Sequence, residues 1–481
     1  MVFNSLSFLL FFIVVFLIYY FPLKEKTSYQ NWLLLLASYF FYGFAAWKMV
    51  PLLLIATTAF YFVGIAIYNA KSDKTANRIT ILGVVLGIGM LLYFKYLNFF
   101  IESFSTLFND IGFHVSWSTF NIIIQLGISF FTFKLISYVI EIHRKHIKPC
   151  TNFVEFATYI AFFPTILSGP IDRPNNFIPQ LQKKRAFDYN LAVDGSLQIL
   201  CGLFKKMVIA DNLATYVDKV WGNIDGASGS TLLIGAIFYS IQIYADFSGY
   251  TDMAIGVSKI FGFKITKNFD YPYFSRNVSE FWRKWHISLM DWLKEYVYIS
   301  LGGNRVPKYR IIINTMVVFL VSGLWHGANW TFVCWGAYHA FLFIPLLLLN
   351  KNKMKTPVGN GRTFPDLKEF FQIMLTFLLI SFGWIIFRAD SLSQAFNYIY
   401  RLFNGSYSEF PELISNNFNL SLFCLLSVFL VAEWFGRDQQ YAIAQLGVNW
   451  KKPLKYALYY AIIIAIFWFR GKGQEYIYFQ F

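Results

Sequence analysis

Long apolar stretches, separated by short polar segments, recur along the whole chain. A helix needs roughly 20 mainly apolar residues to cross the hydrocarbon core of a bilayer. The pattern therefore predicts an all-α polytopic membrane protein with about 11 transmembrane helices. The apolar stretches lie near 6–22, 31–47, 50–69, 79–103, 120–141, 193–210, 231–256, 311–323, 330–350, 369–388, 416–434 and 455–470.

Two segments depart from this alternation. The apolar stretch 152–168 is interrupted by Pro164 and ends in Ser-Gly-Pro, so we expect a re-entrant or half-spanning element. The segment 257–310 is too polar to span and too aromatic for a disordered linker, which indicates amphipathic helices at the interface or around a water-filled cavity. With no internal repeat or second soluble domain evident, residues 1–481 are predicted to form a single membrane domain.

Basic residues set the expected orientation. Lysines and arginines cluster in the short loops after the first, third and fifth predicted spans, which puts these loops in the cytosol and the N-terminus outside. The same rule accounts for the net charge of +15, so nucleic-acid binding is not indicated. Only 14% of the residues are charged, whereas about 25% is usual for soluble domains. The four cysteines form no CxxC pair and indicate neither a disulfide framework nor a zinc site.

The most informative residue is His326, which stands between Trp325 and Gly327 in an apolar stretch. Ionisable groups are costly at membrane depth and are functional candidates by default. Gly323 and Gly327 have GxxxG spacing, which serves either close helix packing or a narrow groove for a thin substrate such as a thioester chain. Asn329 can supply an amide close to the imidazole.

A second histidine lies in the polar segment. If residues 280–293 form one helix, Trp282, Arg283 and His286 share one face, and Trp285 lies on the other. A cation beside an imidazole suits an anionic ligand such as a phosphate, although a basic rim on an interfacial helix has the same pattern.

A third candidate group lies in the apolar span 244–256, which contains polar side chains at Asp246, Ser248, Tyr250 and Asp252. Intramembrane carboxylates normally face the protein interior and pair with another group. These residues can therefore act directly or orient a histidine. No metal-binding, P-loop, Rossmann or GxSxG motif is present in the sequence.

Several motifs, in this order and spacing, resemble those of the membrane-bound O-acyltransferase family, in the bacterial branch that contains the alginate O-acetyltransferase membrane subunit. They are Asp-Phe-Ser-Gly-Tyr-Thr-Asp (246–252), Asn-Phe-Asp-Tyr-Pro-Tyr (268–273), Phe-Trp-Arg-Lys-Trp-His (281–286) and Ser-Gly-Leu-Trp-His-Gly-Ala-Asn-Trp (322–330), with core motifs over about 120–350. The resemblance implies a ring of tilted helices with a funnel to a central histidine and no metal. His326 matches the family's catalytic histidine, and His286 matches the second conserved one.

The resemblance also implies an activity. The chain would move an acetyl group from a cytosolic donor, acetyl-CoA, toward hydroxyls of an extracytoplasmic polysaccharide, either alginate-like exopolysaccharide or peptidoglycan. Acetyl-CoA would be a co-substrate, with no permanently bound cofactor. An extracytoplasmic acetyltransferase of the SGNH type, similar to AlgJ or AlgX, would be its partner in a bacterial cytoplasmic membrane.

Within this hypothesis His326 can act as a general base or as a nucleophile. The candidate residues for binding donor or substrate are Trp282, Arg283, Trp285, Trp325, Asn329, Asp246, Ser248, Tyr250, Asp252 and Asn268. Two alternatives stay open: D-alanyl transfer to teichoic acid from a carrier protein, and a proton-coupled transporter or flippase. The absence of an evident inverted repeat speaks against the latter.

Overall fold

The protein is known from a computed structural model, which describes residues 1–122, 126–352, 356, 358–359, 361–408, 420–446 and 450–479. Within these ranges the regular elements are helices, and no strand occurs. Seven helical stretches are long and apolar enough to cross a membrane, and two shorter apolar helices accompany them. The all-helical, multi-pass class predicted from the sequence is confirmed, whereas the number of 11 spans stays a prediction.

The chain folds into two compact units, Met1–Gly195 with Val257–Thr266, and Ser196–Gly256 with Lys267–Phe481. Two helices, α9 (Tyr189–Leu203) and α11 (Gly229–Ile260), each pass from one unit into the other. The sequence analysis predicted one membrane domain over the whole chain. That prediction is not tested by the division into two compact units and stays a prediction.

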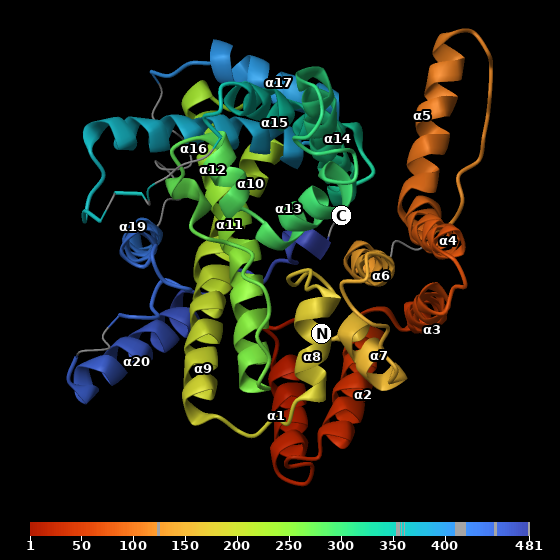
Figure 1. The fold of residues 1–481 in the computed structure, drawn as a ribbon. Coiled ribbons are helices and arrows are strands. Elements are labelled where there is room, and N and C mark those ends of the chain that lie inside the picture. Colours follow the sequence, from red (N-terminus) through yellow and green to blue (C-terminus); the bar gives the residue numbers. More distant parts are fainter. Residues whose placement is uncertain are drawn as a thin grey trace. The chain divides into compact units, whose positions relative to one another are not determined.

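The first unit is helical in its described residues, and α1 and α2 lie side by side in it (Figure 1). Short polar residues begin several helices. For example, Ser72 Oγ accepts a hydrogen bond from the backbone N–H of Thr75 at 3.2 Å and caps α4. The helices are α1 (Leu6–Tyr20), α2 (Thr27–Ala46), α3 (Val50–Tyr68), α4 (Asp73–Leu91), α5 (Leu97–Asp110), α6 (Ile128–His143), α7 (Phe153–Ala161) and α8 (Pro174–Gln182).

The predicted re-entrant stretch is a nine-residue helix, α7, followed by an irregular and buried return. Nine residues are too few to cross a bilayer. Lys134 holds this return in place by donating to Thr165 Oγ1 at 2.8 Å and to the carbonyl of Tyr159 at 3.3 Å. Irregular backbone within a membrane is tolerated where protein covers it. The short helix is as the sequence led us to expect, and its re-entrance into the membrane stays a prediction.

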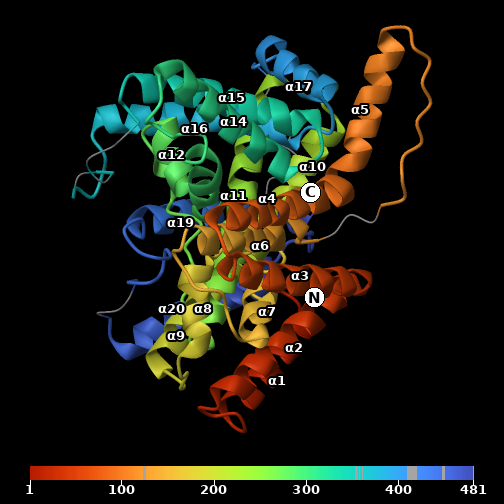
Figure 2. The same cartoon turned by 45° about the vertical axis from the view of Figure 1, so that its right-hand side comes forward.

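The second unit contains the candidate histidines. Its helices, besides α9 and α11, are α10 (Asp211–Gly222), α12 (Val278–Lys284), α13 (Ile287–Leu293), α14 (Lys308–His326), α15 (Trp330–Leu348), α16 (Leu367–Arg388), α17 (Leu392–Asn404), α19 (Leu420–Phe435) and α20 (Lys452–Phe469). Helices α14 and α15 form a tight hairpin, and α12 packs against α15 (Figure 2).

Glycines allow the close approach of α14 and α15. A Cβ atom on Gly323 would lie 2.2 Å from the carbonyl oxygen of Phe332, and one on Gly336 would lie 2.3 Å from that of Phe319. On Gly327 a Cβ would meet the ring of Phe332 at 2.1 Å. Of the two sequence interpretations of the GxxxG spacing, these contacts favour close helix packing.

Replacing Gly323 with alanine should therefore lower the free energy of unfolding by about 1–3 kcal/mol, because the backbones must separate to admit the methyl group. Thermal unfolding in detergent measures this change. Gly89→Ala is the matched control, since Gly89 lies within α4 and a Cβ there meets nothing within 4 Å. Equal melting temperatures for the two variants would contradict the role of Gly323.

The prediction of one continuous helix over 280–293 is wrong. Helix α12 ends at Lys284 and α13 begins at Ile287, with His286 between them in the left-handed region at φ 46°. The break separates His286 from the helix face that carries Trp282 and Arg283. The local segment is also buried, because Trp282, Trp285 and His286 are each at most 3% exposed.

Candidate active site

The two candidate histidines lie together in the second unit, deep inside it. His326 is the last residue of α14 and is 2% exposed, and His286 is 1% exposed. Their ring centroids are 6.5 Å apart. The structure thus brings together the two imidazoles that the sequence analysis singled out from separate motifs.

Asn268 holds the unusual backbone around His286. Its carbonyl accepts the N–H of Ile287 at 2.9 Å, and its Oδ1 accepts the N–H of Ser288 at 3.2 Å. These bonds satisfy two of the amides that a helix leaves without partners at its N-terminus. Asn268, predicted to bind donor or substrate, is fully buried and orients His286 through the backbone.

Aromatic rings surround both imidazoles. Trp325 lies 5.0 Å from His326 and 5.4 Å from His286, between ring centroids, and Tyr478 lies 5.5 Å and 5.9 Å from the same two rings. The contacting rings are those of Phe247, Trp325, Trp335, Phe387 and Tyr478. Aromatic rings thus form much of the wall around both imidazoles, and an imidazole in its neutral form can take a proton or attack a carbonyl.

Burial has a direct electrostatic consequence at His286, which lies outside the membrane-spanning helices. Desolvation of the ring lowers the pKa of His286 to about 3. His286 is therefore neutral throughout the physiological pH range. In this form it can donate one hydrogen bond and accept another, but it brings no charge to the site.

This shift predicts acid sensitivity of the fold. Between the folded pKa of about 3 and the unfolded value of 6.5 the unfolded chain binds the extra proton. The stabilising contribution is therefore complete above pH 6.5 and falls as the pH decreases, by up to about 1.4 kcal/mol per pH unit. Melting curves of wild type and His286→Gln between pH 7 and pH 4 test this. An equal acid slope for the two proteins would contradict the prediction.

An ion network ties Tyr478 to the site. Lys206 Nζ lies 2.6 Å from Asp246 Oδ1 and 2.9 Å from Asp211 Oδ1. The other oxygen of Asp246 accepts the backbone N–H of Ile477 at 2.8 Å. Asp246, a predicted binding residue, thus anchors the segment that carries Tyr478.

The predicted binding residue Tyr250 belongs to the same anchoring region. Its ring lies 5.1 Å from that of Tyr476 and 6.0 Å from that of Phe479, between centroids. Lys206 Nζ also stands 4.4 Å above the centre of the Tyr476 ring. The segment 476–479 is therefore held by a charge, a hydrogen bond and aromatic contacts together.

A second ion network joins α11 to Lys205 and Glu433. Lys205 Nζ is 3.1 Å from Asp252 Oδ2 and 2.9 Å from Glu433 Oε1. Gln198 donates to the second oxygen of Asp252 at 2.9 Å, and the hydroxyl of Tyr244 donates to Glu433. Buried charges are tolerated when they are paired and hydrogen-bonded in this way.

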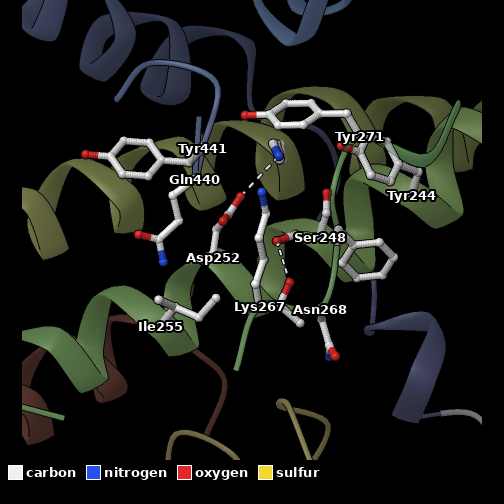
Figure 3. A pocket seen from close by; sticks show the side chains of 12 residues that line it. Tyr244, Ser248, Asp252, Ile255, Lys267, Asn268, Tyr271, Gln440 and Tyr441 are labelled. Atoms are coloured by element: carbon white, nitrogen blue, oxygen red, sulfur yellow. Dashed lines mark hydrogen bonds and ion pairs between the residues drawn. The ribbon is translucent and has the colours of Figure 1, made fainter. Parts of the chain in front are cut away.

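Figure 3 shows the small cavity beside this network, with Asp252, Ser248 and Asn268 around it. Its volume of about 10 Å³ is comparable to the space that one water molecule needs. A donor or acceptor molecule does not fit there. Ser248 and Asp252 therefore face a space of solvent size rather than a substrate cleft.

A much larger cavity of about 630 Å³ lies at the other end of the α14–α15 hairpin from His326. Its lining combines cations with aromatic and apolar side chains, among them Trp282, Arg283, Lys294, Phe319, Phe343 and Leu347. Trp282 also packs on Trp335, with centroids 5.5 Å apart, and Trp335 packs on His326 at 5.1 Å. Aromatic rings thus connect the wall of this cavity to His326.

The remaining predicted binding residues have mainly structural contacts. Asn329 caps α15, since its Oδ1 accepts the N–H of Thr331 at 3.0 Å, and its Nδ2 donates to the carbonyl of Asp390 at 2.9 Å. Trp285 is fully buried, and its ring lies 4.9 Å from that of Trp384. Among the described residues no group of three or more His, Cys, Asp or Glu side chains could hold a metal ion.

Sequence reasoning did not identify Lys205, Lys206 or Tyr478 as parts of this region. The two lysines lie in a π-helical stretch, Phe204–Ala210, inside what the hydropathy pattern marks as an apolar span. An intramembrane lysine is costly and normally has a carboxylate partner, so this signal could have been used. Tyr478 carried no comparable signal.

Known proteins are similar to this chain over most of its length. Residues 143–385 match the model of the membrane-bound O-acyltransferase family. A probable alginate O-acetylase AlgI from Pseudomonas aeruginosa is 38% identical, over 92% of this chain and 82% of the relative. A peptidoglycan O-acetyltransferase from Helicobacter pylori is 33% identical, over 82% of this chain and 78% of the relative. A teichoic acid D-alanyltransferase from Bacillus subtilis is 31% identical, but over 56% of this chain and 69% of the relative.

Proposed function

Because this chain belongs to the membrane-bound O-acyltransferase family, we propose that it transfers an acetyl group from cytosolic acetyl-CoA toward hydroxyls of an extracytoplasmic polysaccharide. The chain is an O-acyltransferase and a multi-pass membrane protein. The observation that carries the proposal is the pair of buried histidines with ring centroids 6.5 Å apart. A bacterial cytoplasmic membrane is the proposed location, since the relatives named above are bacterial proteins.

The choice of acetyl over D-alanyl transfer rests on similarity. The O-acetyltransferase relatives match 82–92% of this chain, whereas the D-alanyltransferase relative matches 56%. The names of the former mention alginate and peptidoglycan, so an extracytoplasmic polysaccharide is the proposed acceptor class. A separate extracytoplasmic acetyltransferase of the SGNH type is the proposed partner that completes the transfer.

His326 can promote the transfer by either of two mechanisms. As a general base, the neutral imidazole takes the proton of the acceptor hydroxyl while the oxygen attacks the thioester carbonyl. The C–S bond then breaks, and the imidazolium returns the proton to the departing thiolate. As a nucleophile, the imidazole itself attacks, the thiol leaves, and the acceptor hydroxyl then cleaves the acyl-imidazole.

The cavity of about 630 Å³ is the proposed donor site. Arg283 and Lys294 supply positive charge for the phosphates of coenzyme A, and the apolar part of its lining suits the thioester arm. The count of predicted spans allows the segment 257–310, which contributes both cations, to face the cytosol. Ring contacts run from Trp282, in the cavity wall, through Trp335 to His326. We propose that the acyl group of the donor lies at the Trp282 side of the cavity, toward His326.

Arg283→Ala should raise the KM for acetyl-CoA about tenfold or more with little change in kcat, because a charge-assisted hydrogen bond to phosphate is lost. Lys284→Ala is the matched control. Its side chain lies 3.5 Å from Glu280, and it does not line the cavity. The assay measures transfer of radiolabelled acetyl from acetyl-CoA by the purified protein, with polysaccharide and partner present.

Several outcomes would contradict the proposal. If only a D-alanyl carrier protein serves as donor, the acetyl assignment is wrong. If no donor supports transfer and His326→Ala changes only the passage of a solute across vesicles, a transporter is the correct class. Equal KM values for the Arg283 and Lys284 variants would remove the phosphate-binding role of the cavity.

A further inference from the structure

A third cavity, of about 450 Å³, lies in the second unit between the end of α10 and the beginning of α17. Its lining is mainly polar and includes Trp221, Asn223, Asp225, Ser391, Gln394 and Asn397. Neither the histidine site nor the donor cavity shares any of these residues. The function proposed above leaves this cavity without a role.

The wall of this cavity formed by α17 begins next to His326. The ring of Phe387, near the end of α16, lies 5.3 Å from that of His326 between centroids. Asn329, three residues after His326, donates to the carbonyl of Asp390, and Ser391 then lines the cavity. A ligand held there would be attached to the same short segment that borders the catalytic histidine.

The cavity and the donor site are predicted to face opposite sides of the membrane. One candidate span, α11, separates 221–225 from the basic segment 257–310. Three candidate spans, α14, α15 and α16, separate that segment from residues 391–397. Both counts are odd, so both walls of this cavity lie on the side opposite the cytosolic donor segment.

The lining chemistry suits hydroxyl groups. Each amide and hydroxyl can both donate and accept hydrogen bonds, as a sugar hydroxyl can. Two of the amides are held in place, because Gln394 Oε1 accepts the N–H of Asp390 at 2.8 Å and Asn397 Nδ2 donates to Asp225 Oδ1 at 3.0 Å. Such restraint reduces the entropy lost when a ligand is ordered.

Trp221 adds an aromatic ring to this lining. The residue is 6% exposed, and its ring stacks on that of Tyr398 with centroids 4.5 Å apart. The indole Nε1 is buried, so the ring offers the cavity no hydrogen-bond donor.

The charges around the cavity are balanced. Arg388 lies 3.2 Å from Asp218, and Arg401 lies 3.0 Å from Asp225, so each cation has a carboxylate partner. This differs from the donor cavity, where Arg283 and Lys294 contribute an excess of positive charge over Asp291. A polyanionic ligand would therefore find both arginines already paired with carboxylates. An uncharged ligand needs no such cation to bind.

From these observations we infer that the cavity between α10 and α17 is a subsite for a neutral, hydroxyl-rich sugar unit of the acceptor. The inference rests on the proposed function, which supplies a saccharide acceptor on that side of the membrane. It narrows the acceptor class, since uncharged sugar units fit the balanced charges better than uronate units do.

The test is the binding of two trisaccharides to the purified full chain in detergent. Titration calorimetry measures the affinity of each. Triacetylchitotriose is the neutral probe, and a mannuronate trimer is the anionic one. The neutral trimer should bind at least about fivefold tighter, and Asn397→Ala should weaken its binding about fivefold through the loss of one hydrogen bond. Asn404→Ala, on the same helix but bonded to the carbonyl of Tyr400 at 2.9 Å, should bind as wild type does.

The outcomes separate this inference from the proposed function. The subsite is excluded if the neutral trimer does not bind, if the mannuronate trimer binds equally or better, or if Asn397→Ala retains wild-type affinity. Unchanged melting temperatures in both variants keep the comparison free of folding defects. Sugar binding by a protein that transfers no acetyl group would overturn the proposed function and leave the subsite intact.

Discussion

Replacing His326 with alanine should reduce acetyl transfer by at least about 10²–10⁴-fold, the range that loss of a general base produces. No other group can replace it readily, because aromatic rings make up much of its surroundings in the described part of the chain. Melting temperatures of the variant and of wild type separate a loss of catalysis from a loss of folding. Initial rates with radiolabelled acetyl-CoA measure the loss.

His326→Gln and His146→Ala complete this experiment. Glutamine keeps the volume and polarity but neither the basicity nor the nucleophilicity of imidazole, so its loss should match that of alanine. His146 lies in the first unit, at the surface, and bonds to Glu141 at 3.0 Å, so its replacement should leave the rate unchanged. A His326→Ala rate within threefold of wild type would end the catalytic assignment.

The same variants separate the two mechanisms. Incubation with labelled acetyl-CoA and no acceptor should leave a covalent label on wild type only if His326 is the nucleophile. That label should be absent from His326→Gln. A wild-type protein that transfers acetyl without ever becoming labelled supports the general-base mechanism.

The second large effect is expected at Asp246. Asp246→Ala removes one of the two carboxylates that pair with Lys206 and also the acceptor for the N–H of Ile477. Breaking a buried pair from one side typically costs about 3–5 kcal/mol. Because the same carboxylate also anchors the segment 476–479 through its other oxygen, activity should fall together with stability. Thermal unfolding and hydrogen exchange at Ile477 measure the two losses.

Asp73→Ala is the matched control for Asp246→Ala. Asp73 pairs with Lys145 at 3.4 Å, but both side chains are largely exposed. Exposed pairs contribute about 0–1 kcal/mol, so a small change is expected. If the two variants lose the same stability, or if Asp246→Ala leaves exchange at Ile477 unchanged, the anchoring role is wrong.

Hydropathy and local breakers were sufficient to predict the helical, multi-pass class and the interrupted stretch at 152–168. Both features depend on residues that are close together in the sequence. A long apolar stretch forms a membrane span, whereas Pro164 and Gly169 interrupt the helix that a span needs. The candidacy of His326 could also be predicted from the sequence. A single ionisable side chain in an apolar span is a functional candidate whatever its contacts are.

The surroundings of the histidines depend on residues far apart in the sequence. Helical periodicity favoured one helix over 280–293, but the hydrogen bonds of Asn268 to Ile287 and Ser288 favour a break at His286. The partners of Asp246 are Lys206, in the π-helical stretch Phe204–Ala210, and the backbone of Ile477. These contacts follow from tertiary packing, which helical periodicity does not describe. The sequence thus predicted some of the residues of the candidate site. It predicted much less of how these residues are arranged in space.

The anchored segment around Tyr478 has a consequence for how the enzyme is made. Tyr478 contacts both histidines, yet it is synthesised after every α-helix that the structure describes. During translation the spans can enter the bilayer one by one while the catalytic centre still lacks part of its wall. Only when residues 476–479 leave the ribosome and Ile477 reaches Asp246 is the centre complete, so the nascent protein should stay inactive until that moment.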